Sequence, residues 1–527
     1  MKQKIKEILK NSFYQLLIIY TALIVLITMG LFWKFTIHME IFALILGILG
    51  IFISSDKNNP DLIKDKTVHY SILAIGLILI FIIRAIPYMN NSIPLGYDTG
   101  IYKYAIEFGL QNTDKWILTG VEPGFLYLMS VFKIFLSTQF ILTYLFIIFN
   151  VILGFSIYLV SKEYFNKNVA LIALFIYAFS IIQFKVFELM YYKNVIALSL
   201  FLFAIYFLNK QKRVPFVICG IILGSIHRPT FYLFGLSYFI YSFINPINFQ
   251  TKKYNFKELS INIISGAIII VGVSLFYFGQ FSLAITSMIS PVVSGFVEPG
   301  QSPGTFIDFF TYQFTTLAYL PFAVIGFFWL IKKKQFNMVF LWALISTIIV
   351  YFQFFFFNRF IIFMDISLII LSAYGFSIII NDKKKIGIAI LSILLLTLAF
   401  SSFSYSINSK PLINNDELSA ISYFHNIPSS AFAMSTSSYY STWLQGYSGR
   451  RVIAPGLFDY DVHTQSQWNE FWTSTNINTT KSFLDDYNKE LYIFIGQKQR
   501  DNLNQFKDKC LSLVYNQNGN KIYKYQC

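Results

Sequence analysis

A single carboxylate, Asp98, stands in a short segment that combines several aromatic residues with turn-forming glycines. The segment reads Ile93-Pro-Leu-Gly-Tyr97-Asp98-Thr-Gly-Ile-Tyr102-Lys-Tyr and follows an apolar stretch. A carboxylate here could take a proton from a reacting hydroxyl group, with Tyr97 and Tyr102 in contact with the acceptor. The alternative is a turn-forming Asp, because Asp readily bonds its own backbone in turns. We expect this segment to be an active site at a membrane surface.

A second acid, Glu122, opens the segment Glu-Pro-Gly-Phe-Leu-Tyr-Leu. It could act as a second acid or orient an acceptor, and the alternative is a helix-capping residue before Pro123. The segment is apolar but short and is interrupted by Lys133. We therefore predict a helix that lies in, or dips into, the outer membrane interface.

Four cations lie near the ends of predicted membrane spans: Arg84, Lys193, Arg228 and Arg359. An ionisable group next to hydrocarbon is costly, so it usually faces a pathway or a site. The alternative for each is a side chain that snorkels to the interface. As a group at one leaflet, these cations suit a phosphate whose negative charge they can stabilise.

These residues belong to a chain of 527 residues that is 56% hydrophobic, 19% aromatic and only 13% charged, which excludes an ordinary soluble domain. Crossing the hydrocarbon takes about 20 apolar residues as helix. The sequence predicts a polytopic α-helical membrane protein with about thirteen transmembrane helices, at residues 14–33, 36–54, 70–88, 138–160, 169–184, 192–208, 214–227, 229–245, 260–278, 315–331, 337–355, 360–380 and 386–404.

The net charge of +15 would suit nucleic acid, but the basic residues cluster in alternate connections between the predicted spans. Lys332 to Lys334 and Lys383 to Lys385 are two such clusters. The positive-inside rule places them in the cytoplasm. We therefore predict a multi-pass cell-membrane protein that does not bind nucleic acid. Its N-terminus is cytoplasmic, and the Asp98 loop, residues 280–311 and the tail after Ser404 are outside.

The composition becomes polar near Tyr405, which predicts two domains. Residues 1–404 form the transmembrane domain, with 89–137 as its first large outer loop, and 405–527 form a small C-terminal extracytoplasmic α/β domain. In this tail we predict a helix at 416–424, strands at 431–436 and 490–495, and a hairpin at 509–527.

The tail offers three candidate acceptor or sugar contacts, Trp443, Tyr447 and Arg450, through stacking and charge. Ordinary domain packing is the alternative. For metals, Asp459 and Asp461 are the one pair with ligand-like spacing, and the signal is weak. No Gly-rich nucleotide loop follows a strand. The sequence thus specifies no cofactor, with a divalent metal left open.

Two cysteines, Cys510 and Cys527, flank a turn signal at Asn518-Gly519. Counting outward from a two-residue turn puts them directly opposite each other, within reach of a disulfide. Such a bond would agree with an oxidising exterior, and two free thiols are the alternative. Cys219 lies in an apolar span and suits packing.

The order of these features resembles the GT-C superfamily of integral-membrane glycosyltransferases, particularly its mannosyltransferase and aminoarabinose-transferase-like branches. The resemblance rests on the Asp98 loop, the segment after Glu122, the turn Tyr191-Tyr-Lys193-Asn194 and Asn358-Arg359-Phe360. The chain departs from the family pattern in having Thr99 after Asp98, Glu122-Pro-Gly-Phe in place of His-Pro-Pro-Leu, and Lys193 where Arg is common.

The resemblance implies transfer of a hexosyl or pentosyl group from a polyprenyl-phosphate-linked sugar to a glycan, lipid or protein acceptor, with inversion at the anomeric carbon. Asp98 would be the base, and the four cations would bind the donor phosphate. Two other functions are open. A lipid-linked polysaccharide polymerase or ligase would also have many spans, and residues 280–311 could serve as its principal loop. A lipid-linked-saccharide transporter or flippase would favour internal repeats and acids deep in spans, and only Asp365 fits that pattern.

Overall fold

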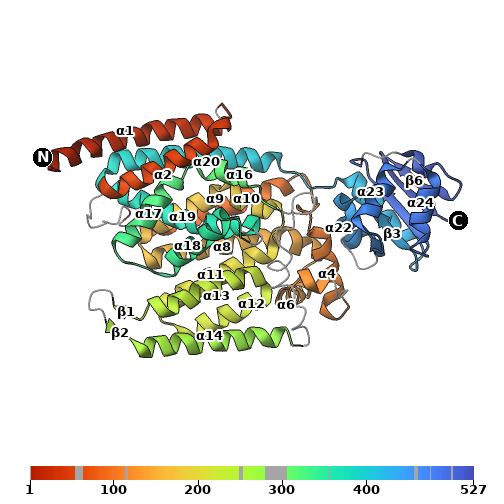
Figure 1. Cartoon of the computed structure of the whole chain (residues 1–527), viewed down its shortest axis with the longest axis horizontal. Helices are drawn as coiled ribbons and strands as arrows, with labels where there is room; N and C mark the ends of the chain where they lie inside the picture. Colours follow the sequence, from red (N-terminus) through yellow and green to blue (C-terminus); the bar gives the residue numbers. More distant parts are fainter. Residues whose placement is uncertain are drawn as a thin grey trace. The chain divides into compact units, whose positions relative to one another are not determined.

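The computed structural model describes residues 2–31, 33–53, 63, 65–112, 117–248, 253–278, 306–354, 357–455, 461–474, 476–499 and 503–527. Most of the predicted 280–311 loop, and Asp459, lie outside the described residues. The described chain forms two compact units (Figure 1). The helical unit contains residues 2–89, 144–278 and 306–409, and the smaller unit contains 90–143 and 410–527.

The helical unit consists of apolar helices, with one short strand pair between α13 and α14. Figure 1 shows many of the helices lying lengthwise beside one another. The elements are α1 (Lys2–Thr28), η1 (Trp33–Phe35), α2 (Thr36–Ile53), α3 (Lys66–Ala85), η2 (Ile86–Tyr88), α8 (Phe146–Tyr164), α9 (Lys167–Phe179), α10 (Ile181–Glu188), α11 (Tyr192–Asn209), α12 (Arg213–Ile226), α13 (Arg228–Ile244), β1 (Ile247–Asn248), β2 (Lys253–Tyr254), α14 (Phe256–Phe276), α16 (Phe309–Thr316), α17 (Leu320–Lys332), α18 (Met338–Tyr351), α19 (Phe357–Asp382) and α20 (Lys384–Asn408).

Among the described residues, eight helices are long and apolar enough to cross a membrane, or ten if each of two bent pairs is one span. The pair α9–α10 bends by 52° and the pair α16–α17 by 82°. The predicted polytopic helical class is confirmed, but the count of thirteen is not. The predicted spans at 169–184 and 315–331 each contain a break, and α12 has only 14 residues.

Helix α19 forms the centre of the helical unit, because 89% of its apolar window is buried by neighbouring helices. It packs most extensively on α17, where Gly375 and Gly326 let the two backbones approach. A Cβ atom added to Gly375 would lie 1.9 Å from the carbonyl oxygen of Phe322. Small residues at helix contacts are the usual means of close packing in membranes.

The smaller unit joins the loop after η2 to the tail. The sheet and helices of the tail are visible in blue in Figure 1, and α4 and α6 of the loop in orange-brown. From the loop come α4 (Thr99–Asn112), α5 (Ile117–Gly120), α6 (Pro123–Lys133), α7 (Thr138–Phe140) and the π-helical turn η3 (Ile141–Leu145), whose last residues begin the helical unit. From the tail come α21 (Asn415–Ser422), η4 (Tyr423–Asn426), β3 (Phe432–Ser435), α22 (Ser438–Tyr447), β4 (Arg451–Ile453), α23 (Gln465–Thr473), α24 (Ile477–Asp485), β5 (Leu491–Ile495), η5 (Leu503–Phe506), β6 (Leu511–Gln517) and β7 (Asn520–Tyr525).

The tail strands form a five-stranded sheet in the order β4-β3-β5-β7-β6. Strands β4, β3 and β5 are parallel, and the hairpin β6–β7 adds to β5 in antiparallel fashion. One buried cluster contains residues of α21 and α22 on one side of the sheet, and another contains residues of α23 and α24. The predicted α/β class, both single strands and the hairpin are confirmed, whereas the sequence reading missed β4, α22, α23 and α24.

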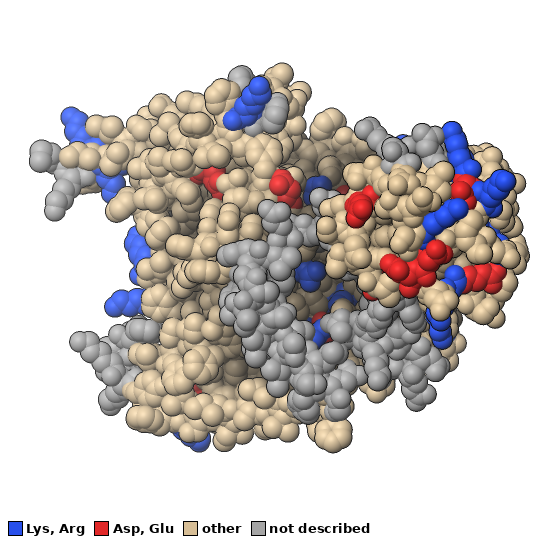
Figure 2. All heavy atoms as spheres, turned by 45° about the vertical axis from the view of Figure 1, so that its right-hand side comes forward, with Lys and Arg blue, Asp and Glu red and all other residues tan. Residues whose placement is uncertain are grey.

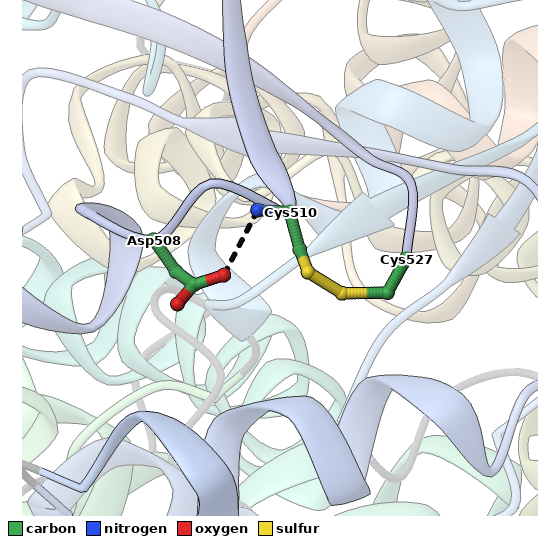
Figure 3. Close-up of side chains that lie close together, drawn as sticks. All are labelled: Asp508, Cys510 and Cys527. Atoms are coloured by element: carbon green, nitrogen blue, oxygen red, sulfur yellow. Dashed lines mark hydrogen bonds between the residues drawn. A yellow bond between two sulfur atoms is a disulfide. The ribbon is translucent and has the colours of Figure 1, made fainter.

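The structure joins Cys510 and Cys527 by a disulfide with a Cα–Cα distance of 5.0 Å (Figure 3). The turn is the predicted Asn518-Gly519, and both residues have positive φ. The predicted direct opposition of the cysteines is wrong. A bulge between Leu513 and Tyr515 shifts the register by one residue. Cys510 therefore lies opposite Gln526, and its backbone carbonyl accepts the N–H of Gln526 at 2.9 Å.

An ion pair lies beside this disulfide. The carboxylate of Asp508 accepts the backbone N–H of Cys510 at 2.9 Å (Figure 3) and lies 3.1 Å from the ammonium group of Lys481. The backbone hydrogen bond and then Lys481 hold the pKa of Asp508 below its ordinary value. These contacts tie the start of β6 to α24.

Candidate functional site

Asp98 lies at the first turn of α4, where its backbone carbonyl accepts the N–H of Tyr102 at 3.0 Å. The chain reverses just before it at Gly96, whose φ of 78° is readily adopted only by glycine. The residue is half-buried. A helix N-terminus favours negative charge at this position.

Helix α22 holds the Asp98 segment in place. The hydroxyl of Tyr97 donates to the carbonyl of Ser438 at 2.6 Å, and the hydroxyl of Thr442 donates to the carbonyl of Tyr97 at 2.6 Å. The backbones of α4 and α22 also touch, since a Cβ atom added to Gly100 would lie 1.7 Å from the carbonyl oxygen of Thr442. The position of Asp98 therefore depends on a helix of the tail.

The two tyrosines that flank Asp98 are buried. Tyr97 and Tyr102 are each 3% exposed, and the ring of Tyr102 lies 5.3 Å from that of Phe125 in α6. Little of either ring is open to a ligand. Their observed contacts position the Asp98 segment against α22 and α6.

Glu122 is buried at the N-terminus of α6, with 2% of its surface exposed. It occupies the capping position, but its side chain makes no capping hydrogen bond. The first turn of α6 instead uses its backbone carbonyl, which accepts the N–H groups of Phe125 and Leu126. The geometry therefore argues against the capping alternative for this side chain.

The three tail candidates differ in exposure. Trp443 is fully buried in the core of the smaller unit, which favours the packing alternative. The guanidinium of Arg450 donates to the carbonyls of Gly449, His425 and Ile427 and so ties loops together. Tyr447 is partly exposed, and its ring lies 4.8 Å from the ammonium group of Lys103 in α4.

Arg84 is fully buried in the helical unit. Its Nε donates to the side-chain oxygen of Asn150 in α8 at 3.1 Å, and its guanidinium lies 5.1 Å from the ring centre of Tyr177 in α9. Tyr177 in turn donates to the carbonyl of Asn150 at 3.1 Å. Arg84 thus links three helices.

The other three cations lie at or near helix N-termini. Lys193 is in the first turn of α11 and is 8% exposed, Arg228 opens α13, and Arg359 lies near the start of α19. Arg359 is exposed, and its guanidinium is 5.2 Å from the ring centre of Phe306. Of the four predicted phosphate-binding cations, Arg359 is exposed, whereas the other three are buried or partly buried.

A buried acid deep in the helical unit was expected from the sequence to have a role only in a transporter or flippase. Asp365 in α19 accepts hydrogen bonds from the hydroxyl of Tyr319, from Ser180 at 3.2 Å and from the amide of Gln183 at 2.7 Å. Ser180 is the break between α9 and α10, and Tyr319 caps α17 at the break after α16. Only the three-dimensional structure could show that one carboxylate holds both breaks.

The described residues give little support for a metal centre. Asp461 accepts hydrogen bonds from Trp468 and Tyr487, so its carboxylate serves the fold. One group, Asp508 with Cys510 and Cys527, brings three potential ligand atoms within 4.8 Å. The two sulfurs are bonded to each other, whereas a metal ligand would be a thiolate.

Both candidate acids, Asp98 and Glu122, belong to the smaller unit, while all four candidate cations belong to the helical unit. Each group is held by its own unit: Asp98 by α22, and Arg84 by α8 and α9. The structure thus places a candidate carboxylate at one helix terminus and candidate cations at or near several others.

Solved structures similar to this chain are GT-C glycosyltransferases. The apo oligosaccharyltransferase of Archaeoglobus fulgidus matches with a TM-score of 0.59 and 14% identity, covering 82% of this chain and 70% of that protein. ArnT from Cupriavidus metallidurans bound to undecaprenyl phosphate matches with a TM-score of 0.57 and 10% identity, covering 87% of this chain and 98% of that protein.

A further match is the Archaeoglobus fulgidus enzyme AglB in complex with an inhibitory peptide and a dolichol-phosphate, with a TM-score of 0.56, 14% identity and coverage of 81% of this chain and 69% of that protein. The predicted GT-C fold is therefore confirmed. No curated protein matches the sequence. The model of the EpsG family matches residues 77–423, from within α3 to η4 and well over half of the chain. The chain belongs to the EpsG family.

Proposed function

We propose that this chain transfers a sugar from a polyprenyl-phosphate-linked donor to an acceptor at the outer face of the membrane. The observation that carries the proposal is the fold shared with two enzymes whose solved complexes hold undecaprenyl phosphate or dolichol-phosphate. A membrane-embedded helical unit suits a donor with a lipid tail. The acceptor class is a glycan, a lipid or a protein.

Asp98 is the base in this proposal. An acceptor hydroxyl oxygen attacks the anomeric carbon, the bond from that carbon to the donor phosphate oxygen breaks, and the acceptor proton passes to the Asp98 carboxylate. The lipid phosphate leaves with the bonding electrons. One displacement inverts the anomeric carbon, and it needs one carboxylate base rather than a nucleophile with an acid/base partner. The buried Glu122 orients the acceptor.

Lys193, Arg228 and Arg359 stabilise the negative charge on the leaving phosphate. Their positions at or near helix N-termini add the favourable end of the helix dipole. For Arg84 we propose a role different from the one expected from the sequence. Its hydrogen bond to Asn150 and its full burial make it a residue that positions helices.

The proposed orientation has the N-terminus in the cytoplasm and the smaller unit outside. It can be tested with Lys333→Cys in the exposed end of α17 and Ser474→Cys after α23, each in a Cys219→Ser background. We expect a membrane-impermeant maleimide to label only the Ser474→Cys protein in intact cells. Labelling of the Lys333→Cys protein, or protection of the Ser474→Cys protein, would contradict the proposed orientation.

The transfer itself can be tested with purified protein in liposomes and a panel of radiolabelled polyprenyl-phosphate-linked and polyprenyl-diphosphate-linked sugars. We expect label to move to an acceptor with at least one of them, and not with the matching nucleotide sugar. Product size then separates two forms of this chemistry. A single addition indicates a simple transferase, and a ladder of products indicates polymerisation. Lack of transfer from every lipid-linked donor across a broad acceptor panel would contradict the proposal.

A further inference from the structure

The helical unit contains a cavity of about 660 Å³ lined mainly by α10, α16 and α20. Its volume lies in the range of small-molecule sites, roughly 300–1,000 Å³. None of the residues to which we assign a role in transfer lines it. The cavity therefore needs its own explanation.

Two of the cavity walls have fixed positions. Helices α10 and α16 are the short halves of the two bent pairs, and Asp365 holds the breaks at which both begin or end. Gln183 in the first turn of α10 adds a 2.7 Å hydrogen bond to the same carboxylate. The cavity is thus built into the fold by a buried polar network.

The charged groups of the cavity balance each other. The ammonium group of Lys185 lies 4.9 Å from the ring centre of Tyr405, and the carboxylate of Glu188 accepts the hydroxyl of Ser409 at 2.8 Å. Among the residues that the structure describes, Lys185 and Glu188 are the charged groups of the lining, so this part of the lining has no net charge. The site favours neither a simple anion nor a simple cation.

The polar lining is rich in hydrogen-bond acceptors. The hydroxyls of Thr28, Thr315 and Ser401 donate to carbonyls one turn earlier in their own helices, at 2.7–2.9 Å. A hydroxyl that donates to its helix offers its oxygen lone pair to a ligand. Beside them lie the rings of Phe310, Phe314 and Phe400, together with the other apolar lining. An uncharged ligand with several hydroxyl donors and an apolar part matches this chemistry.

We propose that this cavity binds a neutral glycosyl group attached to an alkyl chain, as a saccharide site separate from the Asp98 segment. The hydroxyls of the sugar donate to the lining oxygens and to Glu188, while Lys185 donates to a ring oxygen. The alkyl chain packs on the phenylalanines. The inference rests on the proposed function only for the source of such a ligand, a lipid-linked sugar or the glycan end of a product.

Dodecyl maltoside carrying a photoreactive diazirine in its alkyl chain is a suitable probe, used below its critical micelle concentration on the full chain in nanodiscs. We expect mass spectrometry to find the label in peptides of α10, α16 and the end of α20. Unmodified dodecyl maltoside should compete for the site. Dodecylphosphocholine, which has the same chain but a zwitterionic headgroup without hydroxyl donors, should not.

Ser404→Phe places a ring in the cavity from an exposed position of α20, and we expect it to lower labelling roughly tenfold, the effect of about 1.4 kcal/mol. Ile407→Phe is the matched control, because this residue is exposed on the same helix and does not line the cavity. Glu188→Gln should lower labelling without adding bulk.

Equal competition by dodecylphosphocholine, or full labelling of the Ser404→Phe protein, would overturn the proposal. Competition by free maltose as well would support it and indicate a soluble glycan end as the ligand, whereas competition only by the alkyl maltoside would support it and indicate a lipid-linked sugar. The labelling does not require turnover. Selective binding in a protein that fails to transfer would therefore contradict the proposed function alone, and transfer without selective binding would contradict this inference alone.

Discussion

The helical unit and the smaller unit satisfy their polar groups in different ways. In the helical unit, Arg84 and Asp365 are buried and find partners on neighbouring helices. On the face visible in Figure 2, the smaller unit carries both acidic and basic side chains, whereas most of the visible helical unit is uncharged. Hydrocarbon offers no hydrogen bonds, so a buried polar group there needs a protein partner. This difference is the one expected if the helical unit lies in lipid and the smaller unit in water.

A second difference concerns the candidate chemistry. The acids belong to the smaller unit and the cations to the helical unit. In the proposed reaction, the acid acts on the acceptor proton, while the cations act on the lipid phosphate. Substitutions in the two units should therefore affect different measurable steps.

The largest effect should come from Asp98→Asn. The amide keeps the shape of the side chain but cannot take the acceptor proton, so we expect transfer to fall by about 10²- to 10⁴-fold with donor-lipid binding retained. Asp416→Asn, an exposed position in α21, is the control and should keep normal activity. Near-normal turnover by the Asp98→Asn protein would show that Asp98 is not the base.

Gly100→Ala should disrupt the packing of α4 against α22 of the tail. The new methyl group would lie 1.7 Å from a backbone oxygen of α22, a contact that neither helix can relieve without moving. We expect the smaller unit to lose about 3 kcal/mol of stability or more, measured by thermal unfolding and protease sensitivity. Gly120→Ala is the matched control, because nothing lies within 4 Å of its Cβ position. Equal stability of the two variants would show that α4 and α22 do not pack this way.

Replacing Cys510 and Cys527 together with Ser should lower the stability of the smaller unit by about 2 to 4 kcal/mol, the usual range for a closed loop of this size. The helical unit should keep its unfolding temperature, since the disulfide lies within the sheet domain. Mass spectrometry of alkylated protein without prior reduction checks the bond itself. Modification of both cysteines under those conditions would show that the disulfide is absent.

Arg359→Ala should weaken donor binding and turnover together, because a phosphate-facing cation acts in the ground state and in the transition state. Loss of one hydrogen bond to a charged group corresponds to about 1.5–3 kcal/mol, so we expect the apparent donor affinity to fall roughly tenfold to a hundredfold. Exposed Lys333→Ala serves as a control cation. An unchanged donor affinity would place Arg359 outside the phosphate site.

Much of the fold could be predicted because it follows from amino-acid composition and from the length and spacing of apolar residues. Apolar runs predicted the helical membrane class, and β-rich segments with an Asn-Gly turn predicted two single strands and the hairpin. The break at Ser180 could not be predicted, because apolar sequence continues through it and its hydrogen-bond partner Asp365 lies on a distant helix. The break at Tyr319 does carry a local signal that the sequence prediction did not use, Pro321 in the first turn of α17. The bulge in β6 was missed because regular alternation carries no sign of an extra residue.

The candidate site was harder to predict than the fold. Residue type indicated Asp98 and the cations, but burial decided the roles of the others. A Trp such as Trp443 can stack on a sugar, and an Arg such as Arg84 can bind phosphate. In the structure, however, both side chains are fully buried. Sequence offers little warning of this, because an isolated Trp or Arg reads the same whether it faces a ligand or a neighbouring helix.

The stereochemistry of the product tests the central claim most directly. The purified chain would be given a polyprenyl-phosphate-linked sugar of known anomeric configuration, and the configuration in the product would be read from its NMR coupling constants. Single displacement with Asp98 as base predicts complete inversion. Retention would contradict the account, because a single displacement from the face opposite the leaving phosphate always inverts the anomeric carbon.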